Sequence, residues 1–311
     1  MSNFAILTDA TSDLPAEFQK EYEIEVVPGH ILLPDGSDIF TLPEWKYFTK
    51  EAFYKDLRKN PDGYKTSPAN AGELKQKMEE LVDAGKDVLM ITISTGISGL
   101  YDFALQAKKM VLEDYPDAKI EVVDSLRFGP ALGLLSVHAS MLRSEGKTME
   151  ETTEYLEANK NRFHQAGWLD DLTFVAKKGR ITQAKAFFGS LAGVKPIGEF
   201  DYNGLTTVLG KAAGKKAAYK ALLTYIEETV ENPSGQFFFI AESMRRPEAE
   251  EYKKMIEEKF HPKAVYIQDV HPSCGVNIGP GLMAAYYVGK PISKDLSRER
   301  GILEKALQAK E

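Results

Sequence analysis

The chain has 311 residues, 43% of them hydrophobic and 27% charged, so it can bury the cores of two domains or of one large α/β domain. Its formal net charge of −7 and the lack of a long run of Lys or Arg argue against a nucleic-acid or anionic-membrane partner, because binding to a polyanion needs clustered cations. Its single cysteine, Cys274, excludes an intramolecular disulfide and a thiolate metal cluster, and we expect a structural thiol.

The N-terminus, MSNFAILTDA, carries no basic segment followed by a long apolar stretch. No window of the sequence approaches the roughly 18 apolar residues of a membrane-spanning helix. We therefore expect a cytoplasmic protein without stable insertion into a membrane.

Strand, polar turn and helix follow one another three times in the first half of the chain. These units are predicted at residues 4–18, 88–110 and 120–142. Repeated βα units favour a parallel sheet with helices on its faces. A covering helix is predicted over residues 72–85, where apolar residues recur at helical spacing and Gly85 ends the helix.

Residues 43–59 form an aromatic-rich segment with helical character, and the turn signal NPDGY follows at residues 60–64. Such a segment can be a lid over a binding site or simply an insertion. The sequence leaves both interpretations open.

After Lys160 the pattern changes to shorter strands and helices. The segment VKPIGEFDYNGLTTVLG predicts a hairpin that turns at Asn203-Gly204, and a charged helix over about 295–309 ends the chain. Hairpin and αβ elements together suggest a smaller α+β domain. We predict an α/β protein with one domain over residues 1–160 and a second over 161–311.

The most informative segment is residues 88–111, where a buried strand leads through a polar turn into a helix predicted to open near Tyr101. The turn contains Ser94, Thr95, Gly96, Ser98 and Gly99. It follows the carboxyl end of the strand, where open α/β sheets bind ligands. Free backbone N–H groups, the helix dipole and hydroxyl donors would favour an anion there. The alternative is that Ser98 only caps the helix.

Motifs for enzyme chemistry are incomplete. The GISGL sequence around Ser98 lacks the second glycine of the G-x-S-x-G nucleophile elbow, and no histidine is locally tied to it, although triad partners can be distant in sequence. Metal-protease, P-loop and dinucleotide-binding motifs are absent. Asp9, Asp13 and Asp124 follow predicted strands and could act as paired catalytic carboxylates, but such Asp residues often cap helices.

The sequence KKGR at residues 177–180 places Arg180 after a glycine, at the exit of a predicted strand. A guanidinium can pair in a bidentate manner with a carboxylate or a phosphate. The alternative is a solvated surface turn.

Several of these segments resemble, in the same order, the motifs of one family. AILTDATSDLP resembles its opening strand and Asp-Ser/Thr-x-Asp-Leu-Pro turn, KTSPANAGEL its Thr-Ser-Gln-Pro-Ser motif, and STGISGLYDFA its Ser-x-x-Leu-Ser-Gly-Thr-Tyr motif. VVDS, KKGRIT, GVKPI and GPG follow in matching order. The chain thus resembles, over about residues 3–290, the DegV family, whose members bind one long-chain fatty acid and include the FakB subunits of bacterial fatty acid kinase.

The resemblance implies an N-terminal Rossmann-like domain and a C-terminal DegV-type α/β domain, with the acyl chain in an apolar tunnel and its carboxylate at polar residues between the domains. It implies that Thr66, Ser98 and Arg180 hold the carboxylate. The other candidate residues are Ser67, Gly99 and Asn277 for binding, and Asp9, Ser94, Asp124, Ser125, Gly279 and Gly281 for support. Apart from the fatty acid, no cofactor and no metal is implied.

The chain departs from the family pattern in four places. Lys178 replaces the first glycine of Gly-Gly-Arg, and Asn277 stands at the histidine of Gly-Thr-His-x-Gly-Pro-Gly. Ala213 stands where members with a kinase partner carry an arginine. Residues 68–70 are Pro-Ala-Asn in place of Gln-Pro-Ser, so the turn after Thr66 is expected to differ in shape.

From these observations we expect a non-catalytic fatty-acid-binding protein, with any phosphoryl transfer carried out by a partner kinase. The alanine at position 213 weakens the expectation of that partner, so a member that binds lipid without a kinase is a second reading. The rival class is a hydrolase or transferase of a small anionic substrate with Ser98 as nucleophile.

Overall fold

A computed structural model describes residues 4–182 and 193–308 and divides them into two compact units. The first unit comprises residues 4–46, 62–160 and 271–274, and the second comprises residues 47–61, 161–270 and 275–308, each within the described ranges. The division into domains 1–160 and 161–311 stays a prediction, since compactness does not test independent folding.

The first unit is built on a four-stranded parallel sheet in the order β2-β1-β6-β7. Its strands are β1 (Phe4–Asp9), β2 (Ile24–Val27), β6 (Asp87–Thr92) and β7 (Ile120–Asp124). The two central strands are apolar runs buried along nearly their whole length, as expected for strands covered on both faces. The predicted parallel sheet is therefore confirmed.

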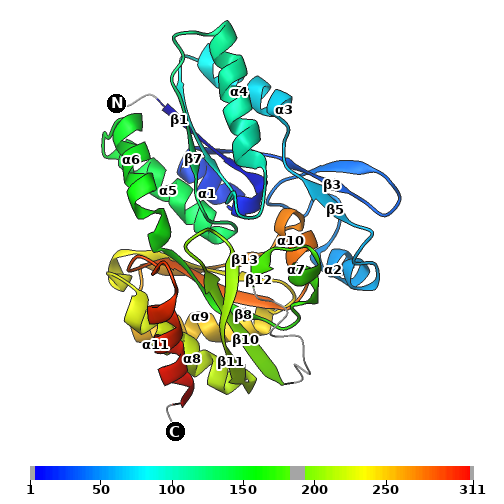
Figure 1. The fold of residues 1–311 in the computed structure, drawn as a ribbon, viewed down its shortest axis with the longest axis vertical. Coiled ribbons are helices and arrows are strands. Elements are labelled where there is room, and N and C mark those ends of the chain that lie inside the picture. The colour runs from blue at the N-terminus through cyan, green and yellow to red at the C-terminus, as the bar shows by residue number, and fades with distance from the viewer. Residues whose placement is uncertain (1–3, 183–192, 309–311) are drawn as a thin grey trace. The chain divides into compact units, whose positions relative to one another are not determined.

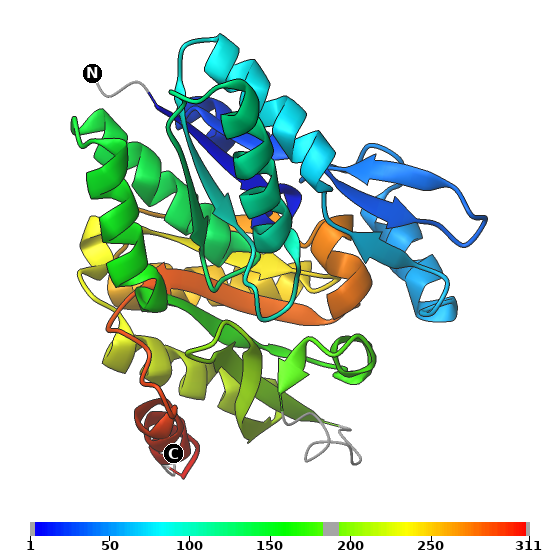
Figure 2. The ribbon, with the colours of Figure 1, turned by 45° about the horizontal axis from the view of Figure 1, so that its top comes forward.

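Helices cover both sides of this sheet (Figures 1 and 2). They are α1 (Ala16–Glu21), α3 (Ala71–Asp83), α4 (Leu100–Asp114), α5 (Pro130–Ser144) and α6 (Met149–Asn159), with a short 3-10 turn η1 (Ala10–Ser12) after β1. The pair α3 and α4 lies side by side, as does the pair α5 and α6. The predicted covering helix is confirmed in α3, which buries Leu74, Met78 and Leu81.

A small antiparallel sheet, in the order β4-β3-β5, was not predicted from the sequence. It consists of β3 (Gly29–Leu32), β4 (Asp38–Thr41) and β5 (Lys65–Ser67). Because β5 lies more than thirty residues after β3 in the chain, its pairing of Thr66 with Ile31 is a long-range contact that local patterns do not reveal.

The aromatic-rich segment forms helix α2 (Lys50–Lys59) and belongs to the second unit. Tyr54 Oη donates to the carbonyl oxygen of Val270 over 2.6 Å, and Lys50 Nζ lies 2.6 Å from Asp269 Oδ1 and also contacts Glu242. Phe53, Tyr54 and Leu57 are buried. These contacts fix α2 to strands of the second unit, which favours the insertion over the lid.

The second unit contains a seven-stranded mixed sheet in the order β13-β12-β14-β8-β10-β11-β9. Its strands are β8 (Phe163–Leu169), β9 (Ile181–Thr182), β10 (Val194–Phe200), β11 (Thr206–Ala213), β12 (Phe237–Glu242), β13 (Ala264–Asp269) and β14 (Leu282–Val288). Its helices are α7 (Thr173–Lys177), α8 (Gly214–Thr229), α9 (Arg246–Phe260), α10 (Pro272–Ile278, partly in the first unit) and α11 (Ser297–Gln308). Short 3-10 turns are η2 (Lys160–Arg162), at the junction of the units, and η4 (Pro233–Gly235).

The predicted hairpin is confirmed, because β10 and β11 pair in antiparallel register around Asn203-Gly204. Gly204 has a φ of +80°, a backbone conformation that glycine adopts at little cost. Asp201 Oδ1 accepts from the N–H groups of Asn203 and Leu205 and closes the turn. The short-range sequence signal was therefore sufficient to place this element.

The pairing of β8 with β14 depends on a glycine in the middle of β8. A Cβ at Gly167 would lie 2.2 Å from the carbonyl oxygen of Met283 and 2.3 Å from Cα of Ala284. We expect Gly167→Ala to lower the free energy of unfolding by about 2–3 kcal/mol, because backbone atoms must move to make room. Denaturant unfolding measures this loss.

The matched control is Gly301→Ala, since Gly301 lies in α11 and a Cβ there would meet nothing within 4 Å. That change should raise the free energy of unfolding by about 0.5–1 kcal/mol, the helix preference of alanine over glycine. Equal effects of the two substitutions would contradict the close approach at Gly167.

Candidate functional site

The polar turn predicted after β6 lies at the carboxyl end of a central strand of the first sheet, as expected. Helix α4 begins at Leu100 with Gly99 as its N-cap, and Gly99 makes no side-chain cap. Ser98 Oγ instead accepts from the N–H of Leu100 over 3.3 Å. Ser98 therefore fulfils part of the capping role, and its own hydroxyl proton donates to no acceptor among residues 4–182 and 193–308.

Carboxylates on the two neighbouring strands hold this turn in place. Asp9, at the end of β1, accepts from the N–H of Ile93 over 2.8 Å through Oδ2. Asp124, at the end of β7, accepts from the hydroxyl of Thr95 over 2.6 Å and from its N–H over 3.2 Å. Burial raises the pKa of Asp9, whereas its hydrogen bonds from Thr11 and Ile93 act in the opposite direction. Both carboxylates thus position the backbone, which favours the structural role over the paired catalytic one.

The backbone of the turn corrects one expectation. The N–H of Gly96 donates to Ser94 Oγ over 3.1 Å, and those of Ile97 and Ser98 donate to the carbonyl oxygen of Ser94 over 3.2 Å each. With Thr95 bound to Asp124, most N–H groups of the turn are occupied by acceptors of the chain itself. The prediction that free N–H groups of this turn would bind an anion is therefore wrong. The remaining donors are the Ser98 hydroxyl and N–H groups in the first turn of α4.

Charged groups of both signs lie near the start of α4. Burial raises the pKa of the Tyr101 phenol, and the carboxylates of Glu157, Asp124 and Asp102 raise it further. Lys160 Nζ lies 2.7 Å from Glu157 Oε2 and donates to the carbonyl oxygen of Asp124 over 3.0 Å, so a cation lies among these acids. A carboxylate bound near Ser98 would gain from a further cation.

The turn after β7 is joined to the turn after β6 through the backbone of Arg127. The N–H of Ser94 and the hydroxyl of Ser125 both donate to the carbonyl oxygen of Arg127 over 2.9 Å. Ser94, Ser125 and Arg127 are fully buried. The two serines therefore have structural partners. Arg127 is a buried cation at this edge that the sequence analysis missed, although an arginine next to a long apolar run could have indicated it.

Thr66 and Ser67 lie on β5, where neighbouring residues point to opposite faces of the sheet. Thr66 is half-buried and Ser67 is exposed, so the two hydroxyls do not share a face. Asn70 is the N-cap of α3 and accepts from Gly72 and Glu73, with the Glu73 side chain completing a capping box. Asparagine caps helices as well as serine does, so the departure from the family motif at this position is conservative.

The structure also corrects the element before Arg180. Residues Thr173–Lys177 form a helix, α7, where a strand was expected, because a short apolar run does not distinguish the two. The N–H of Gly179 donates to the carbonyl oxygen of Ala176 over 3.1 Å, and the N–H of Arg180 donates to that of Val175 over 3.0 Å. This is the pattern of a Schellman motif at the end of a helix. The Arg180 guanidinium donates to the carbonyl oxygen of Lys178 and has no acidic partner in the described part of the chain.

The Gly-Pro-Gly turn lies against α7, the helix that ends shortly before Arg180. A Cβ at Gly279, whose φ is +75°, would lie 2.5 Å from the ring of Phe174 in α7. At Gly281, with a φ of +113°, a Cβ would lie 3.0 Å from Cβ of Asp170. Both glycines therefore have a packing reason, and half-buried Asn277 lies two residues before Gly279 in the chain.

The candidate residues thus fall into two sets, one in each unit. The first unit contains Thr66, Ser67, Ser98 and Gly99 with the supporting residues Asp9, Ser94, Asp124 and Ser125. The second contains Arg180, Asn277, Gly279 and Gly281. Their assignment to one binding site stays a prediction.

Two further properties concern the described residues only. Among residues 4–182 and 193–308, no cluster of three or more His, Cys, Asp or Glu side chains is arranged to hold a metal ion. Within the same ranges, each helix is too short or too polar to cross a bilayer.

The model of the DegV family, described as uncharacterised proteins, matches residues 3–290. A DegV domain-containing protein of Clostridium perfringens is 32% identical over 93% of this chain and 98% of its own length, and one of Clostridium acetobutylicum is 31% identical over 92% and 98%. The chain belongs to the DegV family.

Solved structures agree on the fold. A fatty-acid-binding DegV family protein from Thermus thermophilus superimposes with a TM-score of 0.82 at 22% identity, covering 93% of this chain and all of that one. DegV from Bacillus subtilis, described as a fatty acid binding protein, gives a TM-score of 0.79 at 26% identity with the same coverage. A stearic-acid-binding protein from Eubacterium ventriosum gives 0.79 at 22% identity, covering 92% of this chain and 98% of that one.

The carboxylate of Asp124 is the acceptor that ties Thr95 to the end of β7. We expect Asp124→Ala to lower the free energy of unfolding by about 1–3 kcal/mol, because hydrogen bonds to an ionised group are lost. Hydrogen exchange should accelerate in peptides that cover residues 94–99. Asp117→Ala is the control, since Asp117 is exposed and has no described side-chain partner; the same acceleration in both variants would refute the positioning role.

Proposed function

We propose that the protein binds one long-chain fatty acid and is not itself an enzyme. The observation that carries the proposal is its membership of a family whose solved members, at similar length, include proteins described as binding fatty acids. The candidate residues supply hydroxyl, guanidinium and amide donors, which is the chemistry that a carboxylate requires.

The carboxylate is held, in this proposal, by the hydroxyls of Thr66 and Ser98 and by the guanidinium of Arg180. A carboxylate taken from water needs several donors to offset its loss of hydration. The Ser98 hydroxyl has a proton to give, and Arg180 is not neutralised by a described acid. A cation such as Arg180 can pair with a carboxylate through charge-assisted hydrogen bonds, which are stronger than those of the hydroxyls.

The remaining candidates have secondary roles. Ser67, Gly99 and Asn277 are proposed as further contacts, and an asparagine at position 277 donates through its amide without carrying a charge. Asp9, Ser94, Asp124 and Ser125 act by fixing the turn that presents Ser98. Burial of the acyl chain supplies about 0.8 kcal/mol per methylene and therefore most of the affinity.

A partner kinase would transfer a phosphoryl group from its nucleotide to the bound carboxylate. The structure offers little at Ala213 for such a partner, because this exposed N-cap residue of α8 has neither a cation nor a side-chain donor. Lipid binding without a kinase is therefore the version of the proposal that the chain favours.

Removing both hydroxyls tests the carboxylate site. We expect Thr66→Ala with Ser98→Ala to weaken binding of a fatty acid of about 16–18 carbons by at least roughly 100-fold, since each of the two hydrogen bonds to a charged group contributes about 1.5–3 kcal/mol. Titration calorimetry measures the affinity, and thermal unfolding should remain within a few degrees of the parent protein.

The control pair Thr224→Ala with Ser234→Ala removes the same two kinds of hydroxyl outside the candidate site. Unchanged affinity in the test pair would overturn the site assignment. Covalent labelling of the protein by a serine-directed fluorophosphonate, lost in Ser98→Ala, would instead support the hydrolase or transferase.

The ligand class is tested most directly by mass spectrometry of the protein purified from a bacterial host. Under native conditions we expect one bound fatty acid per chain, which denaturation releases for identification. A protein that is empty and does not take up added oleate or palmitate would contradict the proposal.

A further inference from the structure

The last part of the chain extends beyond the region that the family model matches. We call residues 289–308 the C-terminal arm; it begins one residue before the end of that match and contains α11. Helix α11 packs on α8 and β11 (Figure 1), and Leu303 fits against Gly210, where a Cβ would lie 2.8 Å from its Cδ2. The arm is therefore an integral part of the second unit.

The start of the arm is bound to the body of that unit by a series of backbone contacts. Three N–H groups of the arm donate to backbone carbonyl oxygens, each over 2.8 Å: Gly289 to Arg162, Lys290 to Thr229 and Ile292 to Asn161. Further along, Glu299 is buried and contacts Ser293 and Arg298. Burial would raise the pKa of Glu299, but the hydrogen bonds from Ser293 and Arg298 lower it.

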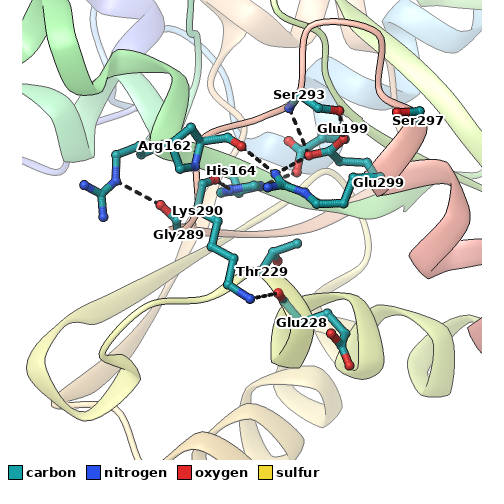
Figure 3. Close-up of polar contacts among 12 residues, drawn as sticks. Arg162, His164, Glu199, Glu228, Thr229, Gly289, Lys290, Ser293, Ser297 and Glu299 are labelled. Atoms are coloured by element: carbon teal, nitrogen blue, oxygen red, sulfur yellow. Dashed lines mark hydrogen bonds and ion pairs between the residues drawn. The ribbon is translucent and has the colours of Figure 1, made fainter.

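One buried histidine contacts both the arm and the core of the sheet (Figure 3). His164, on β8, is fully buried, and its Nδ1 lies 2.7 Å from Glu199 Oε2 on β10. Its Nε2 lies 2.7 Å from the carbonyl oxygen of Lys290 in the arm. The ring stacks on Tyr287 with its centroid 5.1 Å away, so its orientation is fixed.

These two contacts require two protons. A carbonyl oxygen only accepts, so Nε2 must carry a hydrogen. Glu199 already accepts from the N–H groups of Gln165 and Phe200 and from the hydroxyl of Tyr225, an arrangement that favours the ionised carboxylate. An ionised carboxylate only accepts, so Nδ1 then donates as well, and the ring paired with such a Glu199 is an imidazolium.

We propose that the His164–Glu199 pair is a proton-dependent latch for the C-terminal arm. When the ring loses one proton, the proton that stays is the one on Nδ1, because it faces the carboxylate. The lone pair of Nε2 then faces the carbonyl oxygen of Lys290, and because both atoms are acceptors they repel each other where they had shared a hydrogen bond. The arm thus loses a hydrogen bond at Lys290, near its start. Protection of its backbone amides against hydrogen exchange therefore falls as the pH rises.

The groups that face His164 from neighbouring elements support this assignment. Besides Glu199 they are Tyr225 of α8, Tyr287 of β14 and Lys290 of the arm, and Glu299 of the arm acts electrostatically on the two tyrosines. Tyr287 is occupied by a hydrogen bond with Thr229, and Lys290 Nζ points to the carbonyl oxygen of Glu228. Burial beside Glu199 raises the pKa of both tyrosines well above the ordinary value, so both phenols stay neutral.

Hydrogen exchange of the full-length protein tests the latch. Between about pH 6 and about pH 9, we expect protection in peptides covering residues 289–308 to fall roughly tenfold after correction for the intrinsic rate, because a hydrogen bond to the arm is lost. Nitrogen-15 spectra of the His164 ring should show two protonated nitrogens at the lower pH and one at the higher pH. His261→Gln, which removes an exposed histidine, should leave the change intact.

Two variants predict opposite results. In His164→Gln both N–H donors are on one nitrogen, whereas the histidine reaches its two acceptors from two separate ring nitrogens, so the arm should be poorly protected at either pH. Glu199→Gln offers an amide N–H to Nδ1, which leaves the hydrogen on Nε2, so the contact with Lys290 should persist at either pH. The proposal is overturned if the parent protein shows no loss of protection in this window, or if Glu199→Gln loses as much protection as the parent.

Discussion

Carboxylates at the ends of both neighbouring strands hold the turn after β6 through hydrogen bonds. The part of the candidate site that contains Ser98 depends on this constraint. Asp9 holds the residue that leaves the strand, and Asp124 holds Thr95 at the next step of the turn. Parallel strands end at a common edge, so side chains at the ends of adjacent strands can reach the loop between them. The turn is therefore fixed before any ligand arrives, and the Ser98 hydroxyl is presented from a rigid backbone.

This rigidity changes the way in which the site can recognise an anion. A turn with free N–H groups would bind a phosphate or carboxylate through its backbone, whereas here Ser94 accepts most of those protons. Recognition is left to side chains, and a cation would add charge-assisted hydrogen bonds to those of the hydroxyls. A site of this kind suits a ligand whose affinity comes largely from an apolar tail, with the polar contacts setting its orientation.

Sequence patterns were sufficient where a contact is local or where burial is continuous. The apolar run of β6, the stripe on α3 and the Asn203-Gly204 turn each predicted the element that the structure contains. They failed at residues 173–177, because five apolar-rich residues fit either a strand or a helix. The helix ends in a cap at Gly179, whose positive φ is a property of the backbone that the pattern does not show. The small sheet that carries Thr66 was missed for a different reason, since its strands pair across a long stretch of chain.

For the candidate site, sequence located Ser98 at the end of the correct strand and identified the motif that contains Arg180. It did not reveal that Ser94 satisfies the turn from within, that Arg127 is buried at the same edge, or that Thr66 and Ser67 point to different faces. Each of these depends on where neighbouring backbone atoms lie, which residue types alone do not specify.

The course of the chain between the two units also limits how this fold can be divided or recombined. The helix α2 belongs to the second unit although the segments before and after it belong to the first, and residues 271–274 make the reverse excursion. A gene cut after Lys160 would therefore leave each product without a piece of its own unit. Exchange of one unit between relatives would have to move several separate stretches of sequence together, so the two units are expected to be inherited as a whole.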